Sequence, residues 1–169
     1  AMPKASQVAL LNNPKFPATP KIEARVDGAA STLGLAITRI HASDRASLLS
    51  AIDNLAQVRP DALLIGGDAL FVNHSRELIE RASVLRVPVI HYWPGTAEQG
   101  ALISHQADIR DNFRRAAGYV DRILKGAKAG DLPVGTPEKF VLLVNLKTAK
   151  AIGLTIPPSI LSRADTVVE

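Results

Sequence analysis

The sequence predicts an α/β protein built on a doubly wound parallel sheet. Two observations lead to this class. Short, continuously apolar segments recur through the first hundred residues, and segments with helical spacing of apolar residues alternate with them. Strands that are apolar on both sides fit a parallel sheet, because helices cover both of its faces. We therefore expect an open parallel sheet with helices on either side.

The elements of this first part follow in chain order. We expect strands at 7–11, 35–40, 62–65 and 87–91, and helices at 20–33, 44–58 and 73–85. The first helix should end at Gly34, because glycine adopts the left-handed conformation common at helix ends. Ser43 should cap the second helix, because a serine side chain accepts a hydrogen bond from a free backbone N–H.

The residues from about 101 onward are organised differently. A short strand at 101–103 should precede Ser104 and His105, and a helix at 108–125 should follow. After a loop rich in Gly, Ala and Pro come a strand at 140–144, a helix at 146–152 that ends at Gly153, and a final turn. The composition changes near 94–106, which predicts a linker between two structural units.

Composition excludes several classes of function. The chain has 169 residues, 47% of them hydrophobic, and no cysteine, so disulfides and thiolate chemistry are absent. The net charge is +4, but the basic residues are scattered among acids, which argues against a nucleic-acid partner. We find no transmembrane run and no signal peptide, and a native start at Met2 would favour the cytoplasm.

Three segments carry a family resemblance. The run VNLKTAKAIGLTIPPSILSRAD fills 144–165, and FRRAA at 113–117 leads into YVDRILKGAK at 119–128 and DLPV at 131–134. Together they resemble the substrate-binding proteins of ABC transporters, in the family that includes aromatic amino-acid binders. The resemblance implies a type 1 periplasmic binding protein with two Rossmann-like lobes and a ligand cleft between them. It covers essentially the whole chain, which matches only the C-terminal half of such a protein. Residues 3–100 resemble the second lobe, and 101–169 resemble the crossover and the segment that would complete the first lobe.

Polar and aromatic residues follow the expected strands, at the edge where parallel sheets bind ligands. Asp68 could pair with a ligand ammonium group, Asn12 and Ser43 could exchange hydrogen bonds with the ligand, and aromatic rings could stack on it. The candidate ligand-binding residues are Asn12, Asn13, Ser43, Asp68, Phe71, Tyr92 and Trp93. The competing interpretation is that the asparagines and Gly66-Gly67-Asp68 are ordinary turn residues.

Other chemistry has weaker support. His41, His74, His91 and His105 fall near one edge and could bind a transition metal, but no pair has ligand spacing. Nucleophile-elbow, phosphate-loop and dinucleotide-binding motifs are absent, so no catalysis and no cofactor are expected. An α/β enzyme with a nonstandard acid–base site at Asp68 and the histidines stays an alternative.

The leading hypothesis is a substrate-binding component of an ABC import system. The family implies a periplasmic location, a small solute such as an amino acid, and a membrane permease as partners. The helix from Asp108 and the strand from Phe140 would expose apolar faces without the rest of the first lobe. We therefore expect these elements to form a homodimer with a second copy or to fold back on the sheet of the lobe that is present. The alternative is a cytoplasmic regulatory or interaction module that assembles as a half-protein.

Overall fold

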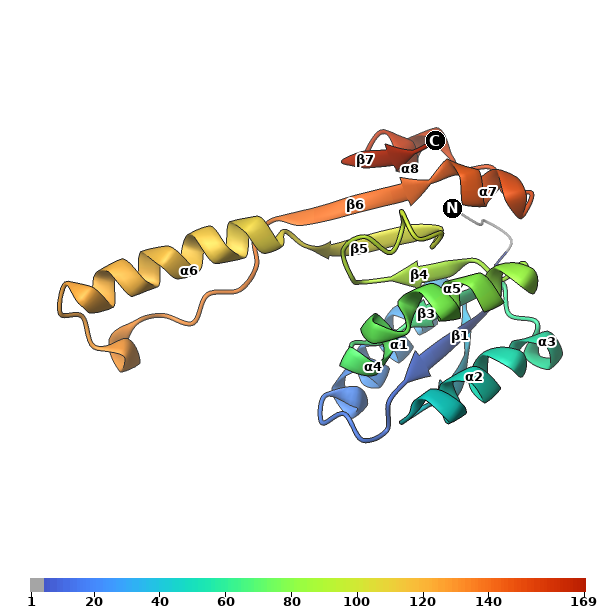
Figure 1. Ribbon diagram of the computed structural model, residues 1–169, viewed down its shortest axis with the longest axis horizontal. Coiled ribbons are helices and arrows are strands. Elements are labelled where there is room, and N and C mark those ends of the chain that lie inside the picture. Colours follow the sequence, from blue (N-terminus) through green and yellow to red (C-terminus); the bar gives the residue numbers. More distant parts are fainter. Residues whose placement is uncertain (1–4) are drawn as a thin grey trace. The chain divides into compact units, whose positions relative to one another are not determined.

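The computed structural model describes residues 5–169, so Met2 lies outside the described residues. It contains a seven-stranded sheet with the order β2-β1-β3-β4-β5-β6-β7 (Figure 1). The strands are β1 (Gln7–Asn12), β2 (Ala36–His41), β3 (Ala62–Ile65), β4 (Val89–His91), β5 (Ile103–Ala107), β6 (Phe140–Asn145) and β7 (Thr166–Val168). β1 to β5 pair in parallel, as do β6 and β7. The predicted α/β class with a mostly parallel sheet is confirmed.

β6 reverses direction relative to β5. The amide of Asn145 donates to the carbonyl of Leu102, and the amide of Asp108 donates to the carbonyl of Lys139, both at 2.9 Å. Residue numbers therefore increase along β5 while those of the hydrogen-bonded residues on β6 decrease, so the two strands are antiparallel.

Helices alternate with the strands as the apolar spacing requires. The α-helices are α1 (Thr19–Leu33), α2 (Arg45–Asp53), α3 (Leu55–Val58), α4 (Ala69–Asn73), α5 (Ser75–Val84), α6 (Ile109–Leu124), α7 (Leu146–Ala151) and α8 (Pro158–Leu161), and η1 (Ala129–Asp131) is a 3-10 turn. α1 ends at Gly34 with φ of 67°, and α7 is followed by Gly153 with φ of 74°. Both glycines therefore act as the sequence predicted.

Three helix boundaries differ from the prediction. Asp44, and not Ser43, caps α2, because its carboxylate accepts the amide of Ser47 at 2.7 Å and completes a capping box. The expected helix at 44–58 divides at Asn54 into α2 and α3. Asp68 caps a helical turn, α4, that begins before the expected start at Asn73.

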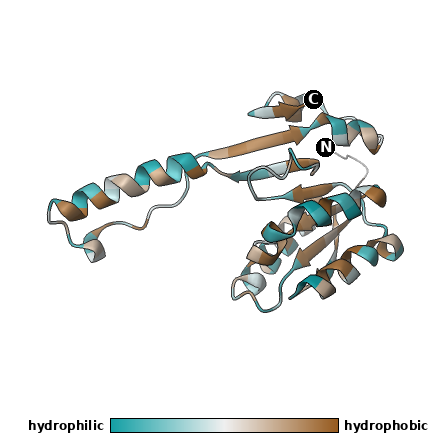
Figure 2. Cartoon of the chain, viewed as in Figure 1, coloured by the Kyte–Doolittle hydropathy of each residue, from teal (hydrophilic) through white to brown (hydrophobic). Residues whose placement is uncertain are grey.

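The core lies between the sheet and its helices. Buried residues of β1 and β3, such as Leu11 and Leu63, pack with Leu48 of α2 and Leu78 of α5, and all four are fully buried. Figure 2 shows these strands as hydrophobic, whereas the helices alternate between hydrophobic and hydrophilic residues. A smaller cluster forms where Leu102 meets Val144 and the residues of α7 and α8.

The segment expected to be a linker is part of this core. Thr96, Ala97 and Leu102 are fully buried, and Asn145 donates to the carbonyl of Ala97 at 2.6 Å. Small side chains and ordered turns let the segment pack closely, so its composition was a poor guide to its exposure. The strand expected at 101–103 is also displaced to Ile103–Ala107, and Ser104 therefore lies within β5.

The chain divides into two compact units. One comprises the described residues up to His105 together with Leu142–Glu169, and the other comprises Gln106–Val141. The second unit holds α6 and η1, and its return segment is tied to α6 by an ion pair of Arg115 with Glu138 at 2.8 Å. Tyr119 donates from Oη to the carbonyl of Pro133 at 2.6 Å. Leu142–Glu169 groups with the first unit because β6 and β7 extend the sheet there.

Candidate functional site

The strand order reverses at the pair β1 and β3. The chain proceeds from β1 outward to β2 and then returns across β1 to begin β3. In open parallel sheets, such a reversal opens a crevice at the carboxyl ends of the two strands, because their following loops diverge to opposite faces. The loops after β1 and β3 hold Asn13 and Asp68, which places two of the candidates at this point.

Asn13 and Asp68 contact each other directly. The Nδ2 of Asn13 donates to Oδ2 of Asp68 at 3.0 Å, while Oδ1 of Asp68 accepts the amide of Leu70 at 2.7 Å. Among the described residues, no Lys, Arg or His forms an ion pair with Asp68. Each oxygen of this half-buried carboxylate therefore has capacity for a further donor.

Aromatic rings follow β4, beside this carboxylate. Tyr92 and Trp93 form an edge-on pair with their centroids 6.2 Å apart, and Trp93 is 40% exposed. Burial raises the pKa of Tyr92; a hydrogen bond with the backbone of Asp68 opposes this rise, and the charge of Asp68 adds to it. A side chain on Gly67 would reach ordinary contact with the Tyr92 ring, so the ring lies close to the turn that holds Asp68.

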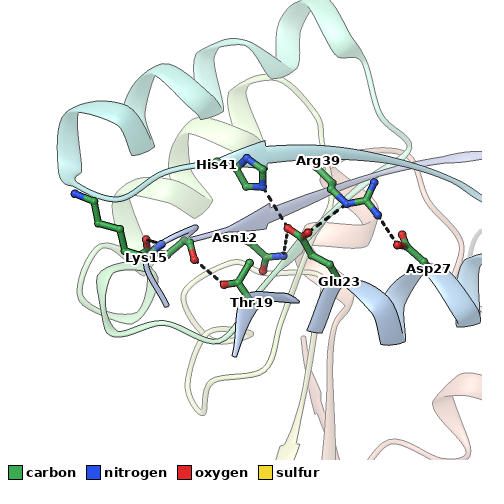
Figure 3. Close-up of polar contacts among 8 residues, drawn as sticks. Asn12, Lys15, Thr19, Glu23, Asp27, Arg39 and His41 are labelled. Carbon is green, nitrogen blue, oxygen red and sulfur yellow. Dashed lines mark hydrogen bonds and ion pairs between the residues drawn. The ribbon is translucent and has the colours of Figure 1, made fainter. Parts of the chain in front are cut away.

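Asn12 belongs to a network of polar side chains instead of an open surface. It is 1% exposed, and its Nδ2 donates to Oε1 of Glu23 on α1 at 3.2 Å (Figure 3). The same carboxylate contacts His41 Nε2 at 3.2 Å and Arg39 Nε at 3.4 Å, and Arg39 also pairs with Asp27. Although burial alone raises the pKa of Glu23, hydrogen bonds from Asn12 and His41 and the charge of Arg39 place it below its usual value.

The remaining candidates lie apart from the Asn13–Asp68 pair. Phe71 is fully buried in the main core, so its ring presents no face to a ligand at the sheet edge. Its position in α4 explains this, because the helix turns the ring inward under the loop. Ser43 is half-buried after β2, and its amide donates to Oγ of Ser47 at 3.1 Å.

Two contributors to this edge were not among the predicted ligand-binding residues, although the sequence placed His91 at this edge as a possible metal ligand. Glu23 lies on α1, far in sequence from the strand ends, and only its charge within an apolar helix stripe could have indicated it. His91 is 1% exposed, and its Nδ1 accepts the amide of Trp93 at 3.0 Å, which orients the aromatic pair. Burial lowers the pKa of His91 to about 4, so the ring is neutral at physiological pH.

The histidines do not converge on one point. His41 contacts Glu23, while His91 is buried beneath the loop after β4. In the part of the chain that the structure describes, no group of three or more His, Asp or Glu side chains is placed to hold a metal ion. Within the same residues, no helix has both the length and the apolar character needed to cross a membrane.

This is an open, mostly parallel α/β sheet with polar side chains gathered at its switch point. Residues 1–168 match the family model described as ABC transporter substrate binding protein, and the chain belongs to that family. The family resemblance of the sequence is thereby confirmed. No curated protein matches the chain.

Several solved structures share the fold, and three of them illustrate the similarity to this chain. A conserved domain protein from Vibrio cholerae is 24% identical with a TM-score of 0.89, and an ABC domain from Streptococcus pneumoniae in complex with L-Trp is 21% identical with a TM-score of 0.89. A ligand-free, open substrate-binding protein with adhesive properties from Clostridium difficile is 22% identical with a TM-score of 0.73. Each is matched over 98% of this chain, which spans only 56%, 56% and 55% of their respective lengths.

Proposed function

We propose that this chain forms one wall of the solute cleft of a substrate-binding protein in an ABC import system. The solute is a small molecule with an ammonium group, such as an amino acid. One observation carries the proposal: Asp68 is a half-buried carboxylate at the switch point, and no cationic side chain of the described residues neutralises it. Family membership supports the binding role, because such proteins are in general non-catalytic.

The contacts of Asp68 suit an ammonium ligand. Its Oδ1 is held by the amide of Leu70 and its Oδ2 by Asn13, so the carboxylate has a fixed orientation before a ligand arrives. A preorganised acceptor loses little entropy on binding, and a hydrogen bond to a charged group is stronger than one between neutral groups. Asn13 therefore acts as the positioning residue for Asp68.

The aromatic pair after β4 supports an apolar or aromatic side chain on the solute. Trp93 is partly exposed, and Tyr92 contacts it edge-on, so one aromatic surface is available close to the carboxylate. Aromatic side chains gain from stacking beyond the area they bury. The structure with L-Trp from Streptococcus pneumoniae supports an aromatic amino acid as the first solute to test.

The rest of the cleft comes from residues beyond this wall. We propose that 3–100 is the second lobe and that 101–169 includes the crossover. Within the latter segment, Gln106–Val141 is the part that enters the first lobe, which its compactness as a separate unit supports. The permease would then meet the assembled protein outside the cytoplasm, which is the usual location of this family.

The apolar face of α6 supports a second proposal, the pairing of two copies. Phe113 is 73% exposed, Val120 55% and Leu124 82%, and they repeat at helical spacing along the second unit. Such a stripe is unusual on a monomer in water. As the alternative to its entry into a first lobe, we propose that it packs against a second copy of the chain, as the half-protein hypothesis requires. Phe113→Glu should then dissociate the dimer in sedimentation experiments, and a monomer at all concentrations before mutation would contradict the pairing.

The ligand proposal is tested by isothermal titration of the chain with L-tryptophan and with its N-acetylated derivative, which lacks the ammonium group. We expect Asp68→Asn to weaken L-tryptophan binding at least tenfold, because asparagine keeps the helix cap but removes the charge. Asp44→Asn is the matched control, since Asp44 also caps a helix but lies away from the switch point. Equal affinity for the two compounds, or equal loss in the two variants, would overturn the proposal.

A further inference from the structure

The amino-terminal edge of the sheet, opposite the Asn13–Asp68 pair, holds a groove of about 340 Å3. It lies where α3 leads into β3 and α5 leads into β4, and these two strands pair in parallel. Buried apolar residues line it, among them Leu55, Pro60 and Val87, together with two exposed arginines, Arg59 and Arg86. We call this surface the arginine groove.

The backbone at both arginines is unusual. Arg59 has φ of 46° and Arg86 has φ of 55°, and they are the only non-glycine residues with positive φ among those the structure describes. An L side chain raises the energy of this left-handed conformation, because its Cβ approaches the following carbonyl oxygen. Residues in unfavourable backbone conformations are often found at functional positions, and two of them lie beside this one groove.

Glycine performs the same backbone role elsewhere in the chain. At the end of α5, the amide of Arg86 donates to Ser83 at 2.9 Å and that of Val87 to Ala82 at 3.0 Å. Gly34 and its successor repeat this pattern after α1, and Gly126 and Gly153 do so after α6 and α7. Glycine is therefore sufficient to end a helix in this way. The arginine side chains at these positions are not needed for the backbone conformation, which leaves them available for another role.

The charges of the two arginines are unmatched. Within the described residues neither forms an ion pair, whereas Arg45 and Arg81 of the flanking helices pair with Glu77 and Asp53. Arg59 makes one weak contact, from Nε to the carbonyl of Ala56 at 3.4 Å. The groove thus combines two guanidinium groups that form no ion pair with apolar residues. Val84, next to Leu85 on its rim, is 83% exposed.

We propose that the arginine groove docks an acidic segment of a partner protein. An apolar side chain of that segment packs against the half-buried Leu85 and the exposed Val84, and carboxylates on either side pair with Arg59 and Arg86. Charge complementarity selects this occupant, because a guanidinium forms two parallel hydrogen bonds with a carboxylate. The apolar rim at Val84 and Leu85 distinguishes this occupant from a free anion, which would leave these side chains exposed. Arginine beside buried apolar residues is also typical of interface centres.

The test uses amide NMR spectra of the full chain, titrated with a synthetic peptide in which one leucine is flanked by glutamates. We expect the amides of residues 55–60 and 84–87 to shift. The double variant Arg59→Gly/Arg86→Gly should keep its fold and unfolding midpoint, because glycine adopts positive φ freely. It should lose at least tenfold in peptide affinity.

Matched controls separate the groove from general charge. Arg25→Ala/Arg76→Ala removes two exposed arginines elsewhere on the same unit and should leave peptide affinity unchanged. A peptide with lysines in place of the glutamates should not bind. Three results would overturn the proposal: equal affinity in the glycine variant, binding of the lysine peptide, or shifts at these amides caused by anionic lipid vesicles but not by the peptide. Since the titration contains no solute, its outcome is independent of the proposed cleft.

Discussion

Replacing Gly66 by alanine provides a sharp test of how the switch point is built. Gly66 follows β3, and a Cβ added to it would lie 1.8 Å from Oδ1 of Asn12 and 3.0 Å from the carbonyl oxygen of Leu11. Its backbone lies outside the left-handed region, so the requirement for glycine is one of space. The side chain of Asn12 has to move before alanine fits.

The magnitude follows from what Asn12 loses. Its side chain is 1% exposed and donates to Glu23, so displacement breaks a hydrogen bond to a carboxylate and strains a packed site. Overpacking costs roughly 1–3 kcal/mol, and a lost bond to a charged group costs about 1.5–3 kcal/mol. We expect Gly66→Ala to lower the free energy of unfolding by about 3 kcal/mol, which corresponds to a fall in Tm of roughly 9 °C.

Urea unfolding followed by circular dichroism measures this change. Gly28→Ala is the control, because its Cβ meets nothing within 4 Å in α1 and should stabilise the helix by about 1 kcal/mol. In an Asn12→Ala background the cost of Gly66→Ala should fall to about 1 kcal/mol, since only the Leu11 carbonyl remains in the way. A cost at Gly66 within about 0.5 kcal/mol of zero would refute the reasoning.

Three further predictions concern other parts of the chain. Burial holds the pKa of His91 at about 4 against an ordinary 6.5, so the neutral ring favours the folded state, and wild type should lose roughly 3 kcal/mol of stability as pH falls from 6.5 to 4. His91→Asn, which keeps an acceptor for Trp93, should lack this slope in urea titrations at stepped pH. Asn145→Ala removes the cap of α7 and the bond to Ala97, so it should cost about 3 kcal/mol, whereas Asn54→Ala, with no side-chain cap bond, should change stability by less than about 0.5 kcal/mol. Tyr119→Phe should speed hydrogen exchange of residues 128–137 and leave that of β1 to β4 unchanged, because it loses only the bond to Pro133; equal exchange in both proteins would count against that bond as the constraint on the loop.

Local patterns predicted the central strands β1 and β3 because these are buried over most of their length. The run at 62–65 and the helix end at Gly34 required no tertiary information, since apolar continuity and a glycine stop signal act within a few residues. The predicted start of α2 was wrong because the carboxylate of Asp44, and not the hydroxyl of Ser43, caps the helix. The predicted linker was wrong because tertiary packing buries the segment around Thr96. β7 was missed because it is short and depends on β6 for pairing.

The candidate site was predictable only in part. Asn13 and Asp68 follow strands that parallel topology brings together, so their meeting could be expected from sequence. The part of Glu23 in holding Asn12 depends on how α1 packs beside β1, which helical spacing does not determine. The aromatic ring of Phe71 suited contact with a ligand, but its position in α4 buries it in the core, which the sequence alone did not indicate. The ligand-binding roles of the candidate residues stay predictions.

The antiparallel return of β6 has a consequence for synthesis on the ribosome. The first five strands emerge in sequence, but β5 gains its second neighbour only after α6 and the following loop have been made. Until then the nascent sheet ends in an unpaired strand, whose free backbone groups are a template for pairing with another chain. Chaperone capture of nascent chains should therefore be strongest in the interval between translation of Ala107 and of Asn145, and should decline once β6 has emerged.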